Sequence, residues 1–556
     1  MFNLSKLISL ITLLYILIVI NSSSVSAQTS FTISEPNPSV VPHVFSGFGA
    51  EWDPFFWNEF GMSQGLNQND WNIITNRIQE MQMPIIRMWV QLFWTLTDAD
   101  PFTWDRTNTR MQSLYKYLDF ACANNIDVDL QDWGWSFWYS HGLFNGNLKD
   151  PRFAEALSLM VKDLVVTRGY NCIKYFSVGN EPDYEIIGKG NPGDVKTLDD
   201  YVVMVENIKQ ALINQGLQNQ VKFVGPDPAC CQSLYSGIMN SSAHGVFDVY
   251  DFHNYSHTSV ISNGSLWQAL NQHRDWISDS PDPDDMKKPI FVTETGGDNG
   301  ASYNNSYAYA LDMADYGTTL LNTTLQAGIA WNMHDIYYDY GHYSVPFEDN
   351  QMMNWGMWKY KNDNWDLRPW AQTWGLLVRF GTKGGTQGTV NGTPPLDLVN
   401  SSYRVGAIKR PDGKWNLFLV NHSSSNATIT INMPGSTSHV FSKYFVNSSS
   451  LSQYPNQIIV PVSGTLNTAN SFNISLSANS FTVLVEDQGV MPSSTPQPSP
   501  KTGDVNGNNI VDFNDLKLVL SNWLGLGSCA TFVCDLNSDA KINAIDASLV
   551  IANWGN

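Results

Sequence analysis

Two glutamates far apart in the sequence each end a short apolar run, in Ser177-Val-Gly-Asn-Glu-Pro182 and in Ile290-Phe-Val-Thr-Glu-Thr295. Such a run is typical of a buried parallel strand that presents a carboxylate at its carboxyl end. A single glutamate of this kind could simply cap the next helix. Two together, Glu181 and Glu294, could cleave a glycosidic bond, because one can protonate the leaving oxygen while the other attacks the sugar or activates water.

The segments around these glutamates alternate between short apolar runs and longer amphipathic stretches such as Trp71–Met81 and Tyr307–Leu321. Eight strands separated by helices predict an α/β fold, a closed (β/α)8 TIM barrel. The alternative, a doubly wound open sheet, would normally carry a Gly-rich phosphate turn after its first strand, and Gly47-Phe-Gly49 is not one. The predicted strands are Val44–Ala50, Pro84–Val90, Ile126–Gln131, Ile173–Gly179, Val221–Gly225, Val246–His253, Pro289–Thr293 and Ala327–Met333.

The barrel is expected to span residues 28–375, and the chain then changes character. Residues 376–488 hold short alternating runs among Asn, Ser, Gly and Thr, which predicts an appended antiparallel β-sandwich. Phe31–Ile33 could add an N-terminal strand to it. This sandwich could brace the barrel or bind glycan. Residues 489–502 are rich in Pro and Ser, as in a flexible linker, and 503–556 form the last segment.

The N-terminus has the pattern of a secretory signal. Lys6 precedes the apolar run Leu7–Ile20, and small residues follow up to Val25-Ser26-Ala27. We therefore expect residues 1–27 to be removed and the mature protein to be secreted and extracellular, with an uncleaved membrane anchor as the alternative.

Composition restricts the partners. The formal charge is −20, from 51 acidic and 31 basic side chains, which argues against nucleic acid or an anionic membrane. The 13% aromatic content, with 20 Trp, is compatible with neutral polysaccharide, since aromatic faces can stack on sugar rings. Six Cys are too few for a disulfide scaffold at this length, although Cys529 and Cys534 could pair locally.

The last segment contains an internal duplication. Acidic and amide residues occupy positions 1, 3, 5, 9 and 12 of a calcium loop, with the carbonyl of Ile510 or Lys541 at position 7, and each loop opens directly into a helix. Two such loops in register predict two Ca²⁺ ions in a small all-α module. The predicted ligands are Asp504, Asn506, Asn508, Asp512 and Asp515 in the first loop and Asp535, Asn537, Asp539, Asn543 and Asp546 in the second.

This duplicated segment resembles a dockerin, the module that attaches carbohydrate-active enzymes to cohesins on scaffolding proteins. The resemblance implies a cohesin partner and possible attachment to the cell surface through a scaffold. Asp515 and Asp546 stand at position 12, as in dockerins, where an ordinary EF-hand has Glu. The Asn-Trp helix ends are typical of a less familiar dockerin class.

The predicted barrel resembles the clan A retaining glycoside hydrolases. Asn180-Glu181-Pro182 matches their fourth-strand motif, and Glu294 in Phe291-Val-Thr-Glu294 matches the seventh-strand nucleophile. The resemblance implies that Glu181 is the acid/base, that Glu294 is the nucleophile and that Asn180 binds the sugar 2-hydroxyl. It implies no cofactor for catalysis.

Four further residues fit the same resemblance. Arg87 in Ile86-Arg87-Met88 matches the second-strand arginine, His253-Asn254-Tyr255 matches the sixth-strand His-x-Tyr, and Trp331 matches the platform under the sugar ring. A guanidinium and a phenol hydroxyl would keep Glu294 ionised, and its negative charge would favour protonated Glu181. Trp133 could line a subsite or pack in the core.

These observations predict a retaining β-glycoside hydrolase that cleaves a cell-wall polysaccharide, with xylan favoured, then β-glucan, then mannan or arabinoside linkages. A barrel followed by a sandwich resembles families 30, 39 and 51, and family 5 also suits the motifs. One alternative is an exo-acting β-xylosidase or α-L-arabinofuranosidase. Another is a non-catalytic carbohydrate-binding scaffold component, which would have no need of both glutamates with Arg87 and Tyr255.

Overall fold

The computed structural model describes most of the chain. The described residues are 29–36, 44–133, 143–185, 187, 195–229, 232–300, 302–338, 351–393, 402–435, 438–486, 503, 505, 511–523, 534, 536 and 541–554. The predicted signal segment and linker lie outside them. The chain divides into two compact units, Met1–Asp487 and Gln488–Asn556. Among the helices described, none is both long and apolar enough to cross a membrane.

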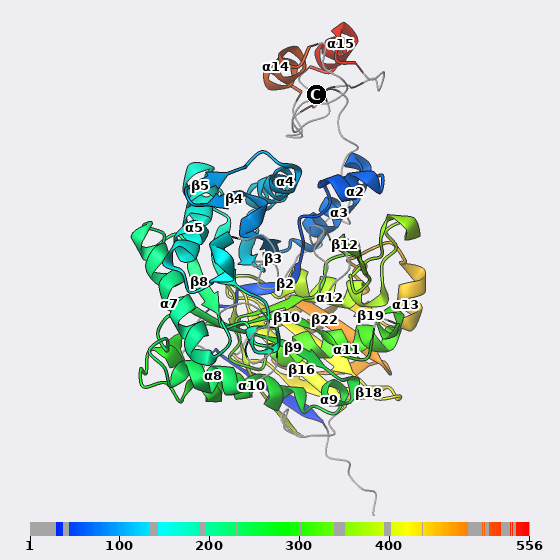
Figure 1. The fold of residues 1–556 in the computed structure, drawn as a ribbon. Coiled ribbons are helices and arrows are strands. Elements are labelled where there is room, and N and C mark those ends of the chain that lie inside the picture. Colours follow the sequence, from blue (N-terminus) through cyan, green and yellow to red (C-terminus); the bar gives the residue numbers. More distant parts are fainter. Residues whose placement is uncertain are drawn as a thin grey trace, which may run out of the picture. The chain divides into compact units, whose positions relative to one another are not determined.

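Eight parallel strands close into a barrel in the first unit (Figure 1). Each corresponds to one predicted strand, so the TIM-barrel prediction is confirmed. The open-sheet alternative is wrong, because the last barrel strand pairs with the first. The strands are β2 (Gly47–Glu51), β3 (Ile85–Val90), β6 (Asp127–Asp132), β7 (Ile173–Val178), β8 (Lys222–Gly225), β9 (Val249–Ser256), β10 (Ile290–Gly297) and β11 (Ala327–Ala330).

The strand pairing sets which polar side chains become neighbours. Glu51 on β2 stands opposite Arg87 on β3. Gly49 makes this close approach of β2 to β3 possible, because a Cβ there would lie 2.1 Å from the carbonyl oxygen of Ile85. Glu294 on β10 stands opposite His253 on β9.

Helices follow most barrel strands. A capping box between Asn67 and Asp70 starts α3, whose buried face includes Ile74 and Ile78 at helical spacing. The longer helices are α3 (Gln68–Met81), α4 (Thr109–Ala123), α5 (Pro151–Lys162), α7 (Leu198–Asn214), α8 (Gln232–Met239), α10 (Leu266–Ile277), α11 (Tyr307–Leu320) and α12 (Pro369–Phe380). Shorter ones are α2 (Glu59–Ser63), α6 (Pro182–Glu185), α9 (Thr258–Ser262) and α13 (Ser448–Gln453).

Two sheets form the β-sandwich around a separate apolar core. One has the order β15-β1-β18-β21 and the other β14-β16-β17-β22-β19-β20. The N-terminal strand joins the first sheet as predicted, but it runs parallel to β18, so the sandwich is not wholly antiparallel. The strands are β1 (Ser30–Ser34), β14 (Thr386–Gln387), β15 (Thr389–Thr393), β16 (Tyr403–Lys409), β17 (Trp415–Asn421), β18 (Ala427–Asn432), β19 (His439–Val446), β20 (Gly464–Thr468), β21 (Ser471–Leu476) and β22 (Ser480–Glu486).

Two small hairpins complete the described strands of the first unit. They are β4 (Leu96–Ala99) with β5 (Phe102–Trp104) and β12 (Ile336–Tyr338) with β13 (Gln351–Met353).

A buried ion-pair cluster joins the barrel to the sandwich. Asp315 on α11 contacts Nε of Arg404 on β16 at 3.2 Å and Nε2 of His422 at 2.8 Å. The Arg404 guanidinium also donates to the carbonyl oxygen of Ile261 on α9. The helix α12 runs through residues 375 and 376, where the boundary between barrel and sandwich was predicted. These buried contacts attach the sandwich directly to the helices of the barrel.

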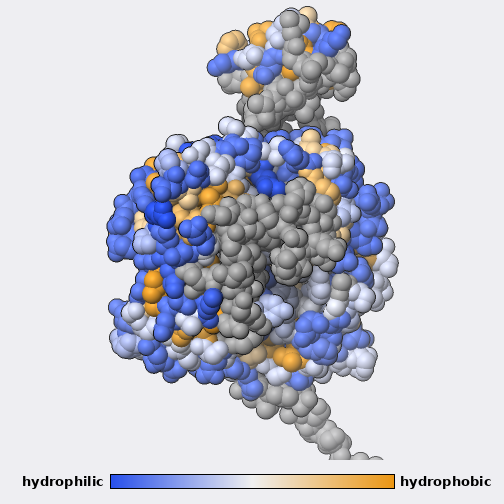
Figure 2. All heavy atoms as spheres, in the orientation of Figure 1, coloured by the Kyte–Doolittle hydropathy of each residue, from blue (hydrophilic) through white to orange (hydrophobic). Residues whose placement is uncertain are grey.

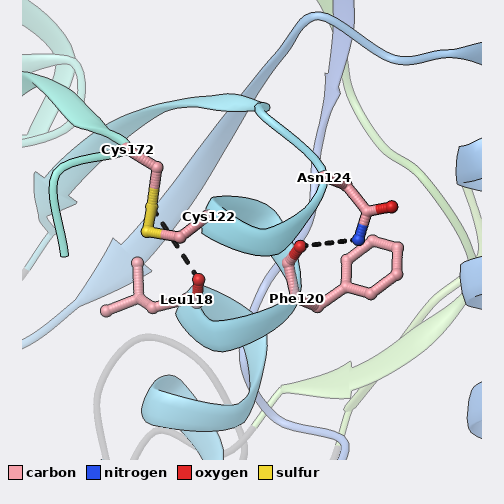
Figure 3. Close-up of a disulfide and its surroundings, with 5 residues drawn as sticks. All are labelled: Leu118, Phe120, Cys122, Asn124 and Cys172. Carbon is pink, nitrogen blue, oxygen red and sulfur yellow. Dashed lines mark hydrogen bonds between the residues drawn. A yellow bond between two sulfur atoms is a disulfide. The ribbon is translucent and has the colours of Figure 1, made fainter. Parts of the chain in front are cut away.

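A disulfide joins Cys122, near the end of α4, to Cys172, just before β7 (Figure 3). The pairing was not predicted. The two residues are separated by 50 positions in the sequence. Closing a loop of this length stabilises the fold by about 4 kcal/mol in the chain-entropy account. Cys534 is also disulfide-bonded, while Cys529, its predicted partner, lies outside the described residues.

The second unit contains two similar helices, α14 (Phe513–Ser521) and α15 (Ala544–Ala552). They share a small apolar core that includes Val511, Val519 and Val550. Apolar atoms also show on the surface of this unit in Figure 2. The exposed apolar side chains include matching pairs from the two repeats: Leu520 and Trp523, then Ile551 and Trp554.

Candidate active site

Glu181 and Glu294 meet at the carboxyl ends of their barrel strands. Glu294 lies on β10, and Glu181 follows β7. One oxygen of each and one ring nitrogen of His253 lie within 4.8 Å of one another. Glu181 has a φ of 45°, which is rare for a residue other than glycine and typical of strained functional positions. The structure therefore brings the two predicted carboxylates together.

Glu294 is held at both oxygens. The guanidinium of Arg87 donates to Oε1, and the hydroxyl of Tyr255 donates to Oε2 at 2.6 Å. Burial and the negative charge of Glu294 raise the pKa of Tyr255 well above its usual value, so the phenol remains a donor. The side chain of Glu294 is therefore fixed in orientation beside a permanent positive charge.

Arg87 is fully buried and serves several acceptors. Besides Glu294, it donates to Glu51 at 2.7 Å, to Asp227 at 3.1 Å and to Asn180 at 3.2 Å. Burial opposes its charge, but Asp227, Glu294 and Glu51 outweigh that effect and raise the pKa of Arg87 well above its usual value. The predicted residue Asn180 is therefore in the site, bonded to the same guanidinium as Glu294.

His253 lies between the two glutamates. Its Nδ1 is 2.9 Å from Oε1 of Glu181 and 3.4 Å from Oε2 of Glu294, and its Nε2 is 3.0 Å from Oδ1 of Asp227. Burial opposes protonation of the ring, but Asp227 and Glu294 dominate and raise the pKa of His253 well above its usual value. The carboxylates on both sides of the ring therefore favour its protonated form, the imidazolium.

Aromatic side chains form one wall. Trp331 directly follows β11, is partly exposed, and donates through Nε1 to Oε1 of Glu51 at 3.1 Å and to the hydroxyl of Tyr338 at 3.2 Å. Trp133 stacks on Trp89 with ring centroids 4.5 Å apart, and both are buried. Trp331 is therefore partly exposed beside Glu51, and Trp133 packs against a neighbouring tryptophan.

Sequence reasoning missed three acidic residues of this site, Glu51, Asp53 and Asp227. Burial, with the charges of Asp53 and Glu294, raises the pKa of Glu51 well above its usual value. Burial raises the pKa of Asp53 to about 7. A signal was present, because Glu51 ends an apolar run just as Glu181 and Glu294 do. Asp227 follows the fifth predicted strand after Pro226 and carried a weaker signal.

The spacing of Glu181, His253 and Glu294 would also permit a bound cation. However, Arg87 and Tyr255 already bind both oxygens of Glu294, and Asp227 helps to raise the pKa of His253, which disfavours the neutral ring that a metal needs. The arrangement suits proton transfer and nucleophilic attack better than metal ligation.

The second unit carries the candidate calcium ligands. Asp515 accepts hydrogen bonds from the backbone nitrogens of Val505 and Asp512, each at 2.8 Å. Asp546 accepts the equivalent pair from Leu536 at 2.7 Å and Asn543 at 2.8 Å. Both aspartates are buried, so the two repeats match in detail and place carboxylates inside their loops. Asp504, Asn506, Asn508, Asp535, Asn537 and Asp539 lie outside the described residues.

Comparison with known sequences identifies only the C-terminal part. Residues 502–553 match the dockerin type I domain. No curated protein matches the chain.

The fold of the first unit is shared with solved glycoside hydrolases. A GH30 endoxylanase from Clostridium papyrosolvens C71 superposes with a TM-score of 0.54 at 15% identity, over 82% of this chain and 99% of that one. The GH51 arabinofuranosidase from Xanthomonas axonopodis pv. citri gives 0.53 at 12% identity, over 83% and 100%. The GH39 enzyme of the same organism gives 0.53 at 13%, over 84% and 99%. These superpositions show a common fold of barrel and sandwich.

Proposed function

We propose that the protein is a secreted retaining β-glycoside hydrolase that acts by double displacement. The observation that carries the proposal is the pair Glu181 and Glu294, with oxygens within 4.8 Å of each other. Retaining enzymes hold their two carboxyl groups about 5–5.5 Å apart, whereas inverting enzymes need about 6.5–9.5 Å to admit a water.

In the first step, Glu294 attacks the anomeric carbon while Glu181 protonates the leaving oxygen. Arg87 and Tyr255 hold both oxygens of Glu294, so the attacking group is oriented before the substrate arrives. The bond between the anomeric carbon and the leaving oxygen breaks as the glycosyl ester forms. Asn180 contacts the sugar 2-hydroxyl and Trp331 stacks on the sugar ring in this proposal.

In the second step, Glu181 acts as a base toward water, which attacks the glycosyl ester and releases Glu294. Esterification has removed the negative charge of Glu294, and the proton of Glu181 has left with the first product. The same pair of side chains thus serves both half-reactions, and the configuration at the anomeric carbon is retained.

The proposed substrate is a cell-wall polysaccharide, with xylan first. Supporting this choice, several enzymes of the same fold are described as GH30 xylanases. The dockerin match supports attachment to a cohesin on a scaffolding protein, with two Ca²⁺ held by the duplicated loops. The Cys122–Cys172 disulfide is compatible with the oxidising environment that a secreted protein meets.

The mature protein should be incubated with xylan, mixed-linkage glucan, mannan and arabinan while product lengths are followed over time. We expect a ladder of oligomers from xylan, and NMR of the first products should show the β-anomer. Monomer as the sole product would indicate the exo-acting alternative. An initial α-anomer would contradict retention, and a folded protein inactive on all four would contradict the proposal. The Glu294→Ala variant, which should be inactive, serves as the negative control.

A further inference from the structure

Asp227 is the ionised centre of the buried network beneath the two glutamates. It follows β8, has a φ of 56°, and is 1% exposed. Its Oδ1 lies 3.0 Å from Nε2 of His253 and accepts from Thr293 at 3.2 Å. Its Oδ2 accepts from Arg87 at 3.1 Å and from Gln131 at 2.7 Å. Five polar neighbours, including Asp251 on its backbone nitrogen, hold this strained residue in place.

The charges around Asp227 shift its pKa in the opposite direction to the pKa values of its acidic neighbours Asp251 and Asp129. Burial opposes its ionisation, but His253 and Arg87 outweigh burial and lower the pKa of Asp227 below its usual value. Burial, helped by the charge of Asp227, instead raises the pKa of Asp251 well above its usual value. Burial also raises the pKa of Asp129 to about 7. Tyr201, which donates to the carbonyl oxygen of Pro226, stays protonated.

Asp227 contacts both positive groups of the site. Arg87 reaches Glu294, and Nδ1 of His253 lies nearer to Glu181, at 2.9 Å, than to Glu294, at 3.4 Å. Arg87 extends from Asp227 to Glu294, and His253 extends from Asp227 to Glu181. Because Nε2 of His253 faces Asp227, a second proton on the ring lies on Nδ1, which faces Oε1 of Glu181. The imidazolium is then a hydrogen-bond donor to Glu181.

We propose that Asp227 is a positioning residue that keeps His253 a donor toward Glu181, so that Glu181 releases its proton readily to a poor leaving group. This inference rests on the proposed glycosidase function and names a residue that assists its acid step.

The proton balance is simple. As the bond from the anomeric carbon to the leaving oxygen breaks, its electron pair goes to that oxygen, which takes the proton of Glu181. The carboxylate left on Glu181 is stabilised by the Nδ1 proton of His253, and Asp227 exchanges no proton. Without the charge of Asp227, His253 would lose its positive charge, and the carboxylate left on Glu181 would lose the stabilisation that this charge gives.

The test uses Asp227→Asn in the full chain and a series of aryl glycosides. The probes are the 2,4-dinitrophenyl, 4-nitrophenyl and phenyl β-xylobiosides, or the same glycosides of whichever sugar the wild type releases from polysaccharide. A dinitrophenolate leaves without protonation, whereas phenolate needs the acid. We expect kcat/KM to fall at least tenfold more for the phenyl than for the dinitrophenyl glycoside. Any loss through Arg87 and Glu294 would be common to the whole series.

Asp315→Asn is the matched control, because Asp315 is also buried between an arginine and a histidine, Arg404 and His422, at the barrel–sandwich junction. It should lower thermal stability and leave the leaving-group dependence unchanged. If Asp227→Asn fails to fold by circular dichroism, His253→Gln carries the test with the same expected pattern.

Two outcomes would overturn the proposal in distinguishable ways. A loss of equal factor across the series in Asp227→Asn, with an active wild type, would overturn the role of Asp227 alone. A wild type that cleaves neither the aryl glycosides nor any polysaccharide would overturn the proposed function and this inference with it.

Discussion

The hydroxyl of Tyr255 donates a 2.6 Å hydrogen bond to Oε2 of Glu294, from the strand next to the one that carries the carboxylate. The other oxygen, Oε1, is held by Arg87. The two oxygens of Glu294 are thus fixed from two different strands, which sets the orientation of the carboxylate.

We expect Tyr255→Phe to lower kcat/KM by about tenfold or more, because a hydrogen bond to a charged group contributes about 1.5–3 kcal/mol and its loss frees the carboxylate to rotate. Steady-state kinetics on the polysaccharide substrate measure the effect. Tyr307→Phe is the matched control, since the Tyr307 hydroxyl donates to the carbonyl of Asn479 in the sandwich. Equal kinetics for Tyr255→Phe and wild type would contradict the role of this hydrogen bond.

Glu294→Ala should abolish turnover while the protein stays folded, because the variant lacks the carboxylate that we propose to form the glycosyl ester. Azide should partly restore cleavage of an activated aryl β-glycoside and give the α-glycosyl azide, since it attacks from the face that Glu294 occupied. NMR identifies the anomer. Residual activity near the wild-type level, or a β-glycosyl azide, would remove Glu294 as the nucleophile.

Asp132, at the end of β6, should make stability depend on pH. Burial raises its pKa to about 8, and the hydrogen bond from the backbone of Leu92 only partly opposes this. An unfolded aspartate has a pKa of about 3.9. The folded state therefore binds the proton more tightly, and the contribution is complete below about pH 4 and is lost as the pH rises toward 8.

Asp132→Asn tests this, because the amide stays neutral and can still accept from Leu92. Thermal unfolding of the variant and the wild type should give similar midpoints near pH 4, with the variant increasingly more stable up to about pH 8 and a constant difference above it. A difference that does not change with pH would contradict the assignment.

The sequence predicted the barrel well because most of its strands, such as β3, β8 and β11, are rich in apolar residues and alternate with amphipathic helices. The same feature placed Glu181 and Glu294 at strand ends, where a closed barrel brings side chains together. Glu51 ends its run in the same way, but its place in the site depends on standing opposite Arg87, where Gly49 lets β2 approach β3 closely. Which residues of two strands stand opposite each other is set by the strand register, which the sequence does not show.

Asp227 could not be placed from sequence, because it lies beyond the end of β8 and reaches His253 and Arg87 only through a turn with positive φ. The Cys122–Cys172 bond could not be placed from sequence either. The Cα atoms of the two cysteines are 4.9 Å apart although 50 positions separate them in the sequence, and this proximity arises only in the folded chain. The parallel pairing of β1 with β18 likewise depends on where the chain returns after the barrel.

The duplicated loops predict a calcium-dependent fold for the second unit alone. Asp515 and Asp546 are buried carboxylates that accept loop backbone hydrogen bonds, and their charge is unfavourable there without a cation. Chelation should therefore unfold 503–556 and leave barrel activity unchanged, because the barrel and sandwich have their own cores. Limited proteolysis of the full chain, with and without EDTA, should show rapid loss of the C-terminal unit only when calcium is removed.

The double variant Asp515→Ala and Asp546→Ala should be sensitive to protease even with calcium, and Lys517→Ala, which changes a charge on α14, is the matched control. Polysaccharide hydrolysis measured in parallel should be equal in all samples. Cohesin binding, the function of a dockerin, should disappear together with protease resistance. Binding that survives excess chelator would contradict the calcium loops, and loss of hydrolysis on chelation would mean that the cation also supports the barrel.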